Sequence, residues 1–200
     1  AKKDKPSARE LIVAGDALAD KKDYGGALLK YNDAYQLIVP ELRGLPFRKP
    51  VRPKLMTRPE LQKHMKKLIA EEYTDADLYE MDRTYKAFHL VPADFGLEET
   101  MTAMLTEEVA GFYNPQNKNM VLIKEADKPK KKRGLLDRIF GAPAGFDKES
   151  QKITLAHEMT HALQDQHFDL QAMDKAVEHD DDMGLALTAL IEGEATLVMF

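Results

Sequence analysis

The chain has no cysteine and no tryptophan among its 200 residues. Without cysteine it cannot form a disulfide framework, a cysteine-based zinc site or a cysteine nucleophile. Basic side chains are also scarce toward the end of the sequence. Residues 151–200 carry 2 basic and 10 acidic side chains, whereas residues 1–67 carry 16 and 8. The net charge of −5 disfavours a nucleic-acid partner. The basic N-terminal part and the acidic C-terminal part are expected either to contact each other or to serve different partners.

A long uncharged apolar run is absent as well. The most apolar stretch, residues 183–200, contains Glu192 and Glu194. Each carboxylate would cost about 2.5 kcal/mol or more in the middle of a bilayer, so no transmembrane segment is expected in this chain. We predict instead a buried helix whose carboxylates have a function. The first residues are rich in lysine and show no apolar signal-peptide core.

Residues 1–40 are predicted to form a helical hairpin. Apolar and small residues recur at helical spacing over residues 6–39, and the turn-forming residues 23–26 interrupt them. Their order resembles a single tetratricopeptide repeat. The matching positions are Gly15, Ala27, Tyr31 and Ala34. Because one repeat cannot bury its own faces, the alternative is an antiparallel helix pair that packs on the rest of the chain.

Proline is concentrated just after this hairpin. Five of the ten prolines lie within residues 40–59, together with six lysine or arginine residues. Closely spaced prolines exclude a helix and favour an extended segment. Residues 41–58 are therefore predicted to be a basic, proline-rich linker, either solvated or docked on the acidic part of the chain. The linker would precede a domain over residues 59–200.

The rest of the sequence predicts a mostly helical α+β fold. Capping residues and apolar spacing predict three further helices, over residues 57–73, 74–89 and 97–105. Two apolar runs, residues 108–113 and 120–123, flank a turn rich in proline and asparagine and predict a β-hairpin. Residues 124–150 are expected to form a surface excursion with a short helix at 135–140. Its basic cluster, KPKKKR, is either a solvated loop tip or an anion site.

The segment His157-Glu158-Met159-Thr160-His161 has the spacing of a metal-binding helix. Imidazoles four residues apart lie on one helix face, at a separation that one zinc ion can span. Glu158 lies about 100° round the helix from His157, where its carboxylate can accept a proton from a zinc-bound water. A catalytic zinc needs a third protein ligand, and the apolar stretch near the end of the sequence offers Glu192 and Glu194.

This pattern resembles the gluzincin metallopeptidases, the thermolysin-like and aminopeptidase-like zinc enzymes, in which a glutamate ligand follows HExxH on a later helix. Residues 191–195, IEGEA, are similar to the Asn-Glu-Gly-Phe-Ala segment of the aminopeptidase branch, and that alignment selects Glu192 as the ligand. The strings AHEMTHALQDQHFDL, ALIEGEAT and EVAGFYNP also resemble a group of little-characterised bacterial metallopeptidases. The resemblance covers about residues 59–200.

The resemblance implies a zincin-like domain that hydrolyses peptide bonds in a peptide or protein substrate. Zinc would be held by His157, His161 and Glu192, and Glu158 would take the proton of the attacking water and pass it to the leaving amine. Residues 111–113 or 120–123 would form the edge strand that pairs with extended substrate. Alternatively, the hairpin serves to cover the core. Export or a cell-envelope location is expected by analogy with secreted peptidases.

The sequence departs from the resemblance at two points. Thr196 stands where thermolysin-like enzymes have an aspartate that orients a histidine. The tyrosine or histidine that stabilises the transition state has no clear counterpart, and the candidates are Tyr113, His167 and His179. Two alternatives follow: an inactive zinc-binding scaffold whose N-terminal helices bind a partner protein, and a precursor inhibited by its own N-terminal part. The acidic residues 178–182 are either a calcium site or a solvated loop with a helix N-cap.

Overall fold

The computed structural model describes residues 5–107, 110–124 and 146–199, and the predicted surface excursion lies largely outside them. The chain divides into two compact units, one of residues 1–55 and 110–200 and the other of residues 56–109. The units do not follow the predicted boundaries at residues 40 and 58. Those boundaries stay a prediction about independently folding segments. The described residues are mostly helical with a small sheet, which confirms the predicted α+β class.

The first unit opens with the predicted helical hairpin, helices α1 (Ala8–Asp20) and α2 (Tyr24–Arg43). Ser7 caps α1 in a reciprocal capping box with Glu10. The two helices pack closely where Gly15 faces the ring of Tyr31, since a Cβ on Gly15 would lie 2.4 Å from a ring carbon. The Tyr31 hydroxyl donates to Asp16 at 2.7 Å, which fixes the same contact at its polar end.

The ends of the predicted linker are helical and extended, and the segment between them is docked on the first unit while Arg48, Lys49 and Pro50 stay exposed. Helix α2 continues through Pro40 to Arg43, although the proline lacks the amide for one backbone hydrogen bond of the last turn. Gly44 ends the helix in the left-handed conformation at φ 65°. Strand β1 (Pro53–Met56) occupies the other end of the predicted linker. Between them the chain is docked on helix α7 (Lys148–Phe168): the Gln166 carboxamide accepts from the amides of Arg48 and Lys49 at 2.8 and 3.0 Å and donates to the Lys49 carbonyl.

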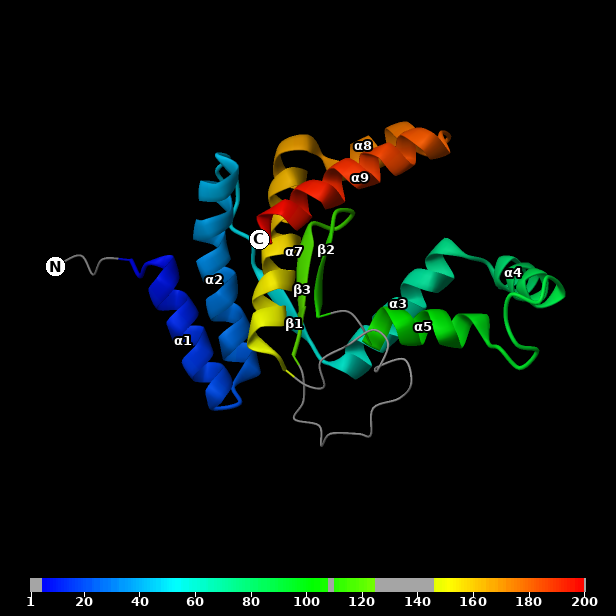
Figure 1. Cartoon of the computed structure of the whole chain (residues 1–200), viewed down its shortest axis with the longest axis horizontal. Helices are drawn as coiled ribbons and strands as arrows, with labels where there is room; N and C mark the ends of the chain where they lie inside the picture. Colours follow the sequence, from blue (N-terminus) through cyan, green and yellow to red (C-terminus); the bar gives the residue numbers. More distant parts are fainter. Residues whose placement is uncertain (1–4, 108–109, 125–145, 200) are drawn as a thin grey trace. The chain divides into compact units, whose positions relative to one another are not determined.

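The predicted β-hairpin is present as strands β2 (Gly111–Asn114) and β3 (Asn119–Ile123), which pair antiparallel with Gly111 opposite Leu122. The Asn114 side chain accepts from the amides of Gln116 and Asn117, so the turn is closed by its own asparagine. Among the described residues the sheet has three strands in the order β1-β3-β2, and β2 lies at one edge (Figure 1).

Helix α7 is the centre of the first unit, and it packs against α2, α9 and β2 (Figure 1). It begins at Lys148, with Asp147 as its N-cap, so the excursion predicted to reach residue 150 ends earlier. Its apolar face completes a core shared by the α1–α2 hairpin, strand β3 and the docked segment, residues 45–52. That core consists of Ala19, Ala27, Leu28, Tyr31, Val39, Val51, Met120, Leu122, Leu155, Met159, Ala162 and Leu163.

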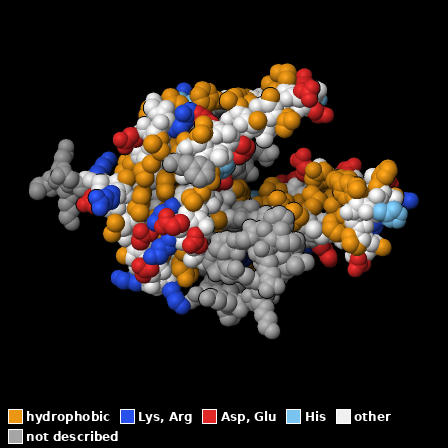
Figure 2. Space-filling model, viewed as in Figure 1, with side chains coloured by type: hydrophobic (Ala, Val, Ile, Leu, Met, Phe, Trp, Pro, Cys, Tyr) orange, Lys and Arg blue, Asp and Glu red, His pale blue; other side chains and the backbone are white. Residues whose placement is uncertain are grey.

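Helices α8 (Leu170–Val177) and α9 (Asp181–Val198) follow α7. Asp180 caps α9 by accepting from the Met183 amide at 2.9 Å, which is the N-cap role that the acidic run allowed. The prediction that α9 is buried is wrong. Ala195 is buried, but Leu185, Leu190 and Leu197 are 71%, 67% and 79% exposed, and Figure 2 shows apolar side chains over the surface of this helix. The helix covers α7 along one edge and leaves the rest of its apolar surface uncovered.

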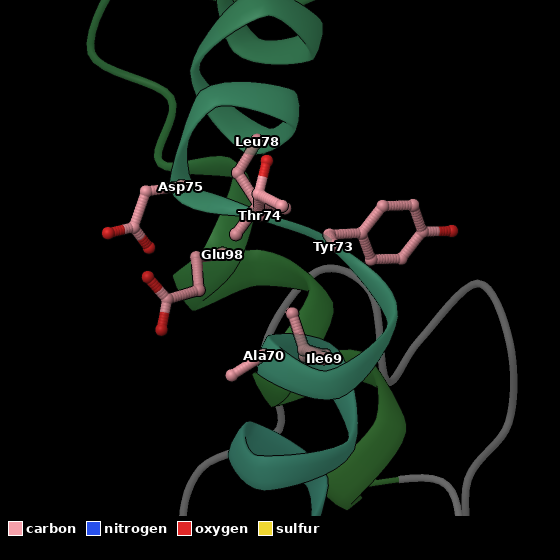
Figure 3. A pocket seen from close by; sticks show the side chains of 7 residues that line it. All are labelled: Ile69, Ala70, Tyr73, Thr74, Asp75, Leu78 and Glu98. Atoms are coloured by element: carbon pink, nitrogen blue, oxygen red, sulfur yellow. The ribbon is translucent and has the colours of Figure 1, made fainter.

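The second unit consists of helices α3 (Arg58–Glu72), α4 (Asp75–Ala87) and α5 (Leu97–Glu107), close to the three predicted spans. Thr57 and Thr74 form capping boxes with Glu60 and Asp77. A cavity of about 260 Å³ lies between these helices, and Figure 3 shows the carboxylates of Asp75 and Glu98 on the same side of it. No helix within the described parts of either unit is long and apolar enough to cross a membrane.

Candidate metal centre

Helices α7 and α9 bring three metal-binding side chains of the first unit together. The Nε2 atoms of His157 and His161 lie 3.0 Å apart, as the i, i+4 spacing predicts. From α9, Glu192 places Oε2 3.0 Å from His157 Nε2 and Oε1 3.5 Å from His161 Nε2. Ligand atoms of all three residues therefore lie within 4.8 Å of one another. The three residues predicted to hold zinc form one cluster.

The donor set fits a zinc ion. A tetrahedral zinc with ligands at about 2.0–2.1 Å has those ligands about 3.3 Å apart. The separations of 3.0 to 3.5 Å are close to this value, with one oxygen of Glu192 toward each histidine. Two imidazole nitrogens and one carboxylate oxygen are also the ligand types of known catalytic zinc sites. His157 and His161 are largely buried whereas Glu192 is exposed, so the cluster is open on the α9 side.

Each histidine also has a partner at its other ring nitrogen. His161 Nδ1 lies 2.9 Å from Oε1 of Gln164, and His157 Nδ1 lies 3.2 Å from the sulfur of Met199. Burial lowers the pKa of His157, and the neighbouring His161 lowers it further, against the opposing effect of Glu192. The neutral imidazole that a metal requires is thus favoured at His157.

Glu158 lies beside the cluster and against strand β2. Its Oε2 accepts from the backbone amide of Tyr113 at 2.8 Å. Burial raises the pKa of Glu158 to about 7, while the Tyr113 amide and His161 act in the opposite direction. A carboxylate that titrates near neutral pH is suited to accept and return a proton. This is the position that the sequence assigned to the catalytic base.

Asp165, one turn after His161 on α7, fastens β2 to the helix. It is buried and accepts from the Tyr113 hydroxyl at 2.6 Å, from Lys118 Nζ at 2.8 Å and from the Leu170 amide at 3.0 Å. Burial and Asp165 raise the pKa of Tyr113, and hydrogen bonding to Asp165 raises the pKa of Lys118. Tyr113 therefore contacts α7 twice, through its amide and its hydroxyl.

The remaining sequence candidates lie elsewhere. Glu194 pairs with Arg43 and accepts from Gln164 instead of reaching the histidines. His167 contacts the Pro46 carbonyl at 2.8 Å, and His179 is 91% exposed beside Glu178. Thr196 is exposed, and the Nδ1 atoms of His161 and His157 contact Gln164 and Met199 instead. Of the three candidates for a transition-state stabiliser, Tyr113 contacts Glu158 through its backbone amide, whereas its hydroxyl donates to Asp165.

Sequence reasoning missed Gln164 and Asp165, although their spacing carried a signal. Residues three and four positions after His161 lie on the same face of a helix as its imidazole. A buried polar side chain at either position needs a hydrogen-bonding partner near the cluster.

Comparison of the chain with protein-family models, curated proteins and solved structures gave no match.

Proposed function

We propose that this protein is a zinc-dependent peptidase that hydrolyses peptide bonds by means of an activated water. The observation that supports the proposal is the convergence of Glu192 on the two imidazoles of the HExxH helix, which lie 35 and 31 residues earlier in the sequence. A pattern in the sequence could arise without function. Three donors that meet at ligand-to-ligand distances, beside a buried carboxylate, are harder to explain by core packing alone.

His157, His161 and Glu192 would hold the ion, and the chain supplies the proton transfers. When bound, zinc would polarise the scissile carbonyl and lower the pKa of the attacking water. Glu158 would accept the proton of that water and deliver it to the leaving amine. The Tyr113 amide holds one oxygen of the Glu158 carboxylate at 2.8 Å and leaves the other oxygen for this task.

Strand β2 offers a place for an extended substrate. The carbonyl of Ala110 accepts from the Ile123 amide, so the backbone of alternate residues from Ala110 points toward β3. The backbones of Gly111 and Tyr113 then point away from β3, toward the edge of the sheet, where the Tyr113 amide already donates to Glu158 and the backbone of Gly111 is left for a peptide. A peptide that pairs with this edge would place its backbone next to the candidate base.

Zinc content and hydrolysis test the proposal together. We expect about one zinc per chain, with Glu192→Ala weakening zinc binding about 10-fold or more and Glu194→Ala weakening it less. Glu158→Gln retains the acceptor for the Tyr113 amide and removes the base. It should bind zinc as the wild type does and lower the rate of peptide cleavage by about 10²–10⁴-fold. The assay is digestion of a broad peptide library.

Two results would contradict the proposal in different ways. A wild type that binds no zinc after reconstitution would remove the metal centre. A wild type that binds zinc but cleaves no peptide would favour the alternative, a zinc-binding scaffold that engages a partner protein through its N-terminal helices.

A further inference from the structure

We propose that Gln164 is a positioning residue that fixes the tautomer of His161 and ties the α9 helix to it, so that one side chain aligns the ligands from both helices. The predicted effect of Gln164 on metal affinity rests on the proposed function. The positioning role itself is inferred from the hydrogen bonds of Gln164. Gln164 is 4% exposed, lies one turn after His161 on α7 and belongs to no ligand set itself.

The partners of Gln164 determine the orientation of its carboxamide. Its Nε2 faces the backbone carbonyl of Ile191 at 3.1 Å and a carboxylate oxygen of Glu194. A carbonyl and an ionised carboxylate can only accept, so the NH₂ group must lie on this side and both of its hydrogens are used. The remaining atom, Oε1, can only accept, and it lies 2.9 Å from His161 Nδ1.

His161 must therefore donate from Nδ1 to Gln164. In a neutral imidazole the other nitrogen then carries a lone pair. That nitrogen, Nε2, is the one 3.0 Å from His157 Nε2 and 3.5 Å from Glu192 Oε1. Gln164 thus holds His161 in the form that can bind a metal and keeps its lone pair aimed at the cluster.

The same side chain sets the position of the third ligand. Ile191, whose carbonyl accepts from Gln164, directly precedes Glu192 in the sequence. Most of α9 is exposed, so few apolar contacts hold it in register against α7. Arg43 of α2 forms an ion pair with Glu194, whose carboxylate also accepts from the Gln164 amide. The chain of contacts runs from Arg43 through Glu194 and Gln164 to His161.

The tautomer is measured directly in the metal-free protein by two-bond ¹H–¹⁵N correlation spectra of the histidine rings. We expect the wild-type His161 to carry its proton on Nδ1. Gln164→Glu keeps an acceptor and should keep this tautomer, whereas Gln164→Leu removes it and should shift the population toward Nε2–H. A wild-type His161 protonated at Nε2 would overturn the inference, whichever variants fold.

Zinc affinity, measured by chelator competition, tests the consequence. Gln164→Leu should weaken zinc binding by about 10–100-fold. The matched control is Gln166→Leu, the same substitution two residues further on α7, where the carboxamide contacts Arg48 and Lys49 instead of the cluster. This control should stay within about threefold of the wild type, even though it also loses hydrogen bonds and some stability. Equal losses in the two variants would show a general effect on folding and overturn the positioning role.

The two experiments separate this inference from the proposed function. If the wild type binds no zinc, the proposed function is wrong, and the tautomer spectra still decide the role of Gln164. If the wild type binds zinc and cleaves peptides while Gln164→Leu retains full zinc affinity, the inference is wrong and the proposed function stands.

Discussion

At the scale of single residues, the site depends on polar side chains that are buried and fully matched. Asp165 accepts from three donors, and Gln164 accepts once and donates twice. Both lie on α7 within one turn of His161, and both join it to another element. Because an unmatched buried polar group costs free energy, the loss of either side chain should affect its partners as well.

Asp165→Ala tests this at the residue that holds β2. The substitution leaves the Tyr113 hydroxyl and the Leu170 amide without their acceptor and removes the shorter of the two acidic contacts of Lys118, so we expect the free energy of unfolding to fall by about 2–4 kcal/mol. Asp169→Asn is the control, because Asp169 contacts the same Lys118 at 3.4 Å, its side chain is 64% exposed, and asparagine tolerates the left-handed backbone at φ 53°. It should change stability by less than about 0.5 kcal/mol. Urea unfolding of the metal-free protein measures both, and comparable losses would contradict the buried network.

The residues that could be predicted were those whose role depends on spacing along one helix. The i, i+4 histidines and the neighbouring Glu158 follow from helix geometry alone, and their places in the structure agree with it. The choice between Glu192 and Glu194 did not follow from spacing, because it depends on how α9 lies against α7. Gln164 contributes a hydrogen bond to that contact, and a hydrogen bond between residues 27 positions apart leaves no local pattern.

At the scale of elements, local signals located the helices well and their burial poorly. Thr57 and Thr74 mark predicted helix starts that the structure confirms, and Asp180 takes the N-cap role that was one alternative for residues 178–182. The apolar composition of α9 predicted burial, but the helix contacts its neighbours along one edge and leaves Leu185 and Leu197 exposed. The prolines predicted an extended segment from residue 41, yet α2 includes Pro40 and ends at Arg43, with Gly44 as its C-cap. Composition describes what a segment can do, whereas tertiary contacts decide where it lies.

The N-terminus of α7 gives a pH-dependent prediction. The Ser150 side chain and amide hydrogen-bond Asp147, and these contacts hold the pKa of Asp147 below its usual value. A carboxyl group whose pKa is lower in the folded state stabilises the protein above the unfolded pKa, and that stabilisation is lost as the pH falls through the folded pKa. Asp147→Asn can still cap the helix but does not titrate. Between about pH 6 and about pH 3, the free energy of unfolding should therefore fall further in the wild type than in Asp147→Asn. Parallel decreases in chemical unfolding experiments would contradict a titrating cap.

At the scale of the whole chain, the N-terminal part of the first unit contributes both basic and acidic side chains to salt bridges with its C-terminal part. Arg43 of the basic part pairs with Glu194 of the acidic part, as the net charges suggest. Asp16 and Asp20 of the basic part also pair with Lys152 and Lys148. Salt bridges depend on individual positions, so net charge did not predict these contacts. The docked segment contacts Gln166, about 140° round α7 from His161. That position is unfavourable for an inhibitory segment lying over the cluster.

The packing of residues 1–55 on helix α7 predicts that a chain beginning at Thr57 will not fold stably. Residues 1–55 supply Ala27, Leu28, Tyr31, Val39 and Val51 to the core that also buries Leu155, Met159 and Leu163 of α7. Without them, the face of α7 opposite the histidines is exposed, and burying a single such side chain contributes about 1.5–3 kcal/mol. We expect the shortened chain to lose its cooperative thermal transition and its zinc binding. Adding a peptide of residues 5–56 should restore both in proportion to its concentration, because it provides α1, α2 and the docked segment. A shortened chain that unfolds cooperatively and cleaves peptides faster than the full chain would instead support inhibition by the N-terminal part.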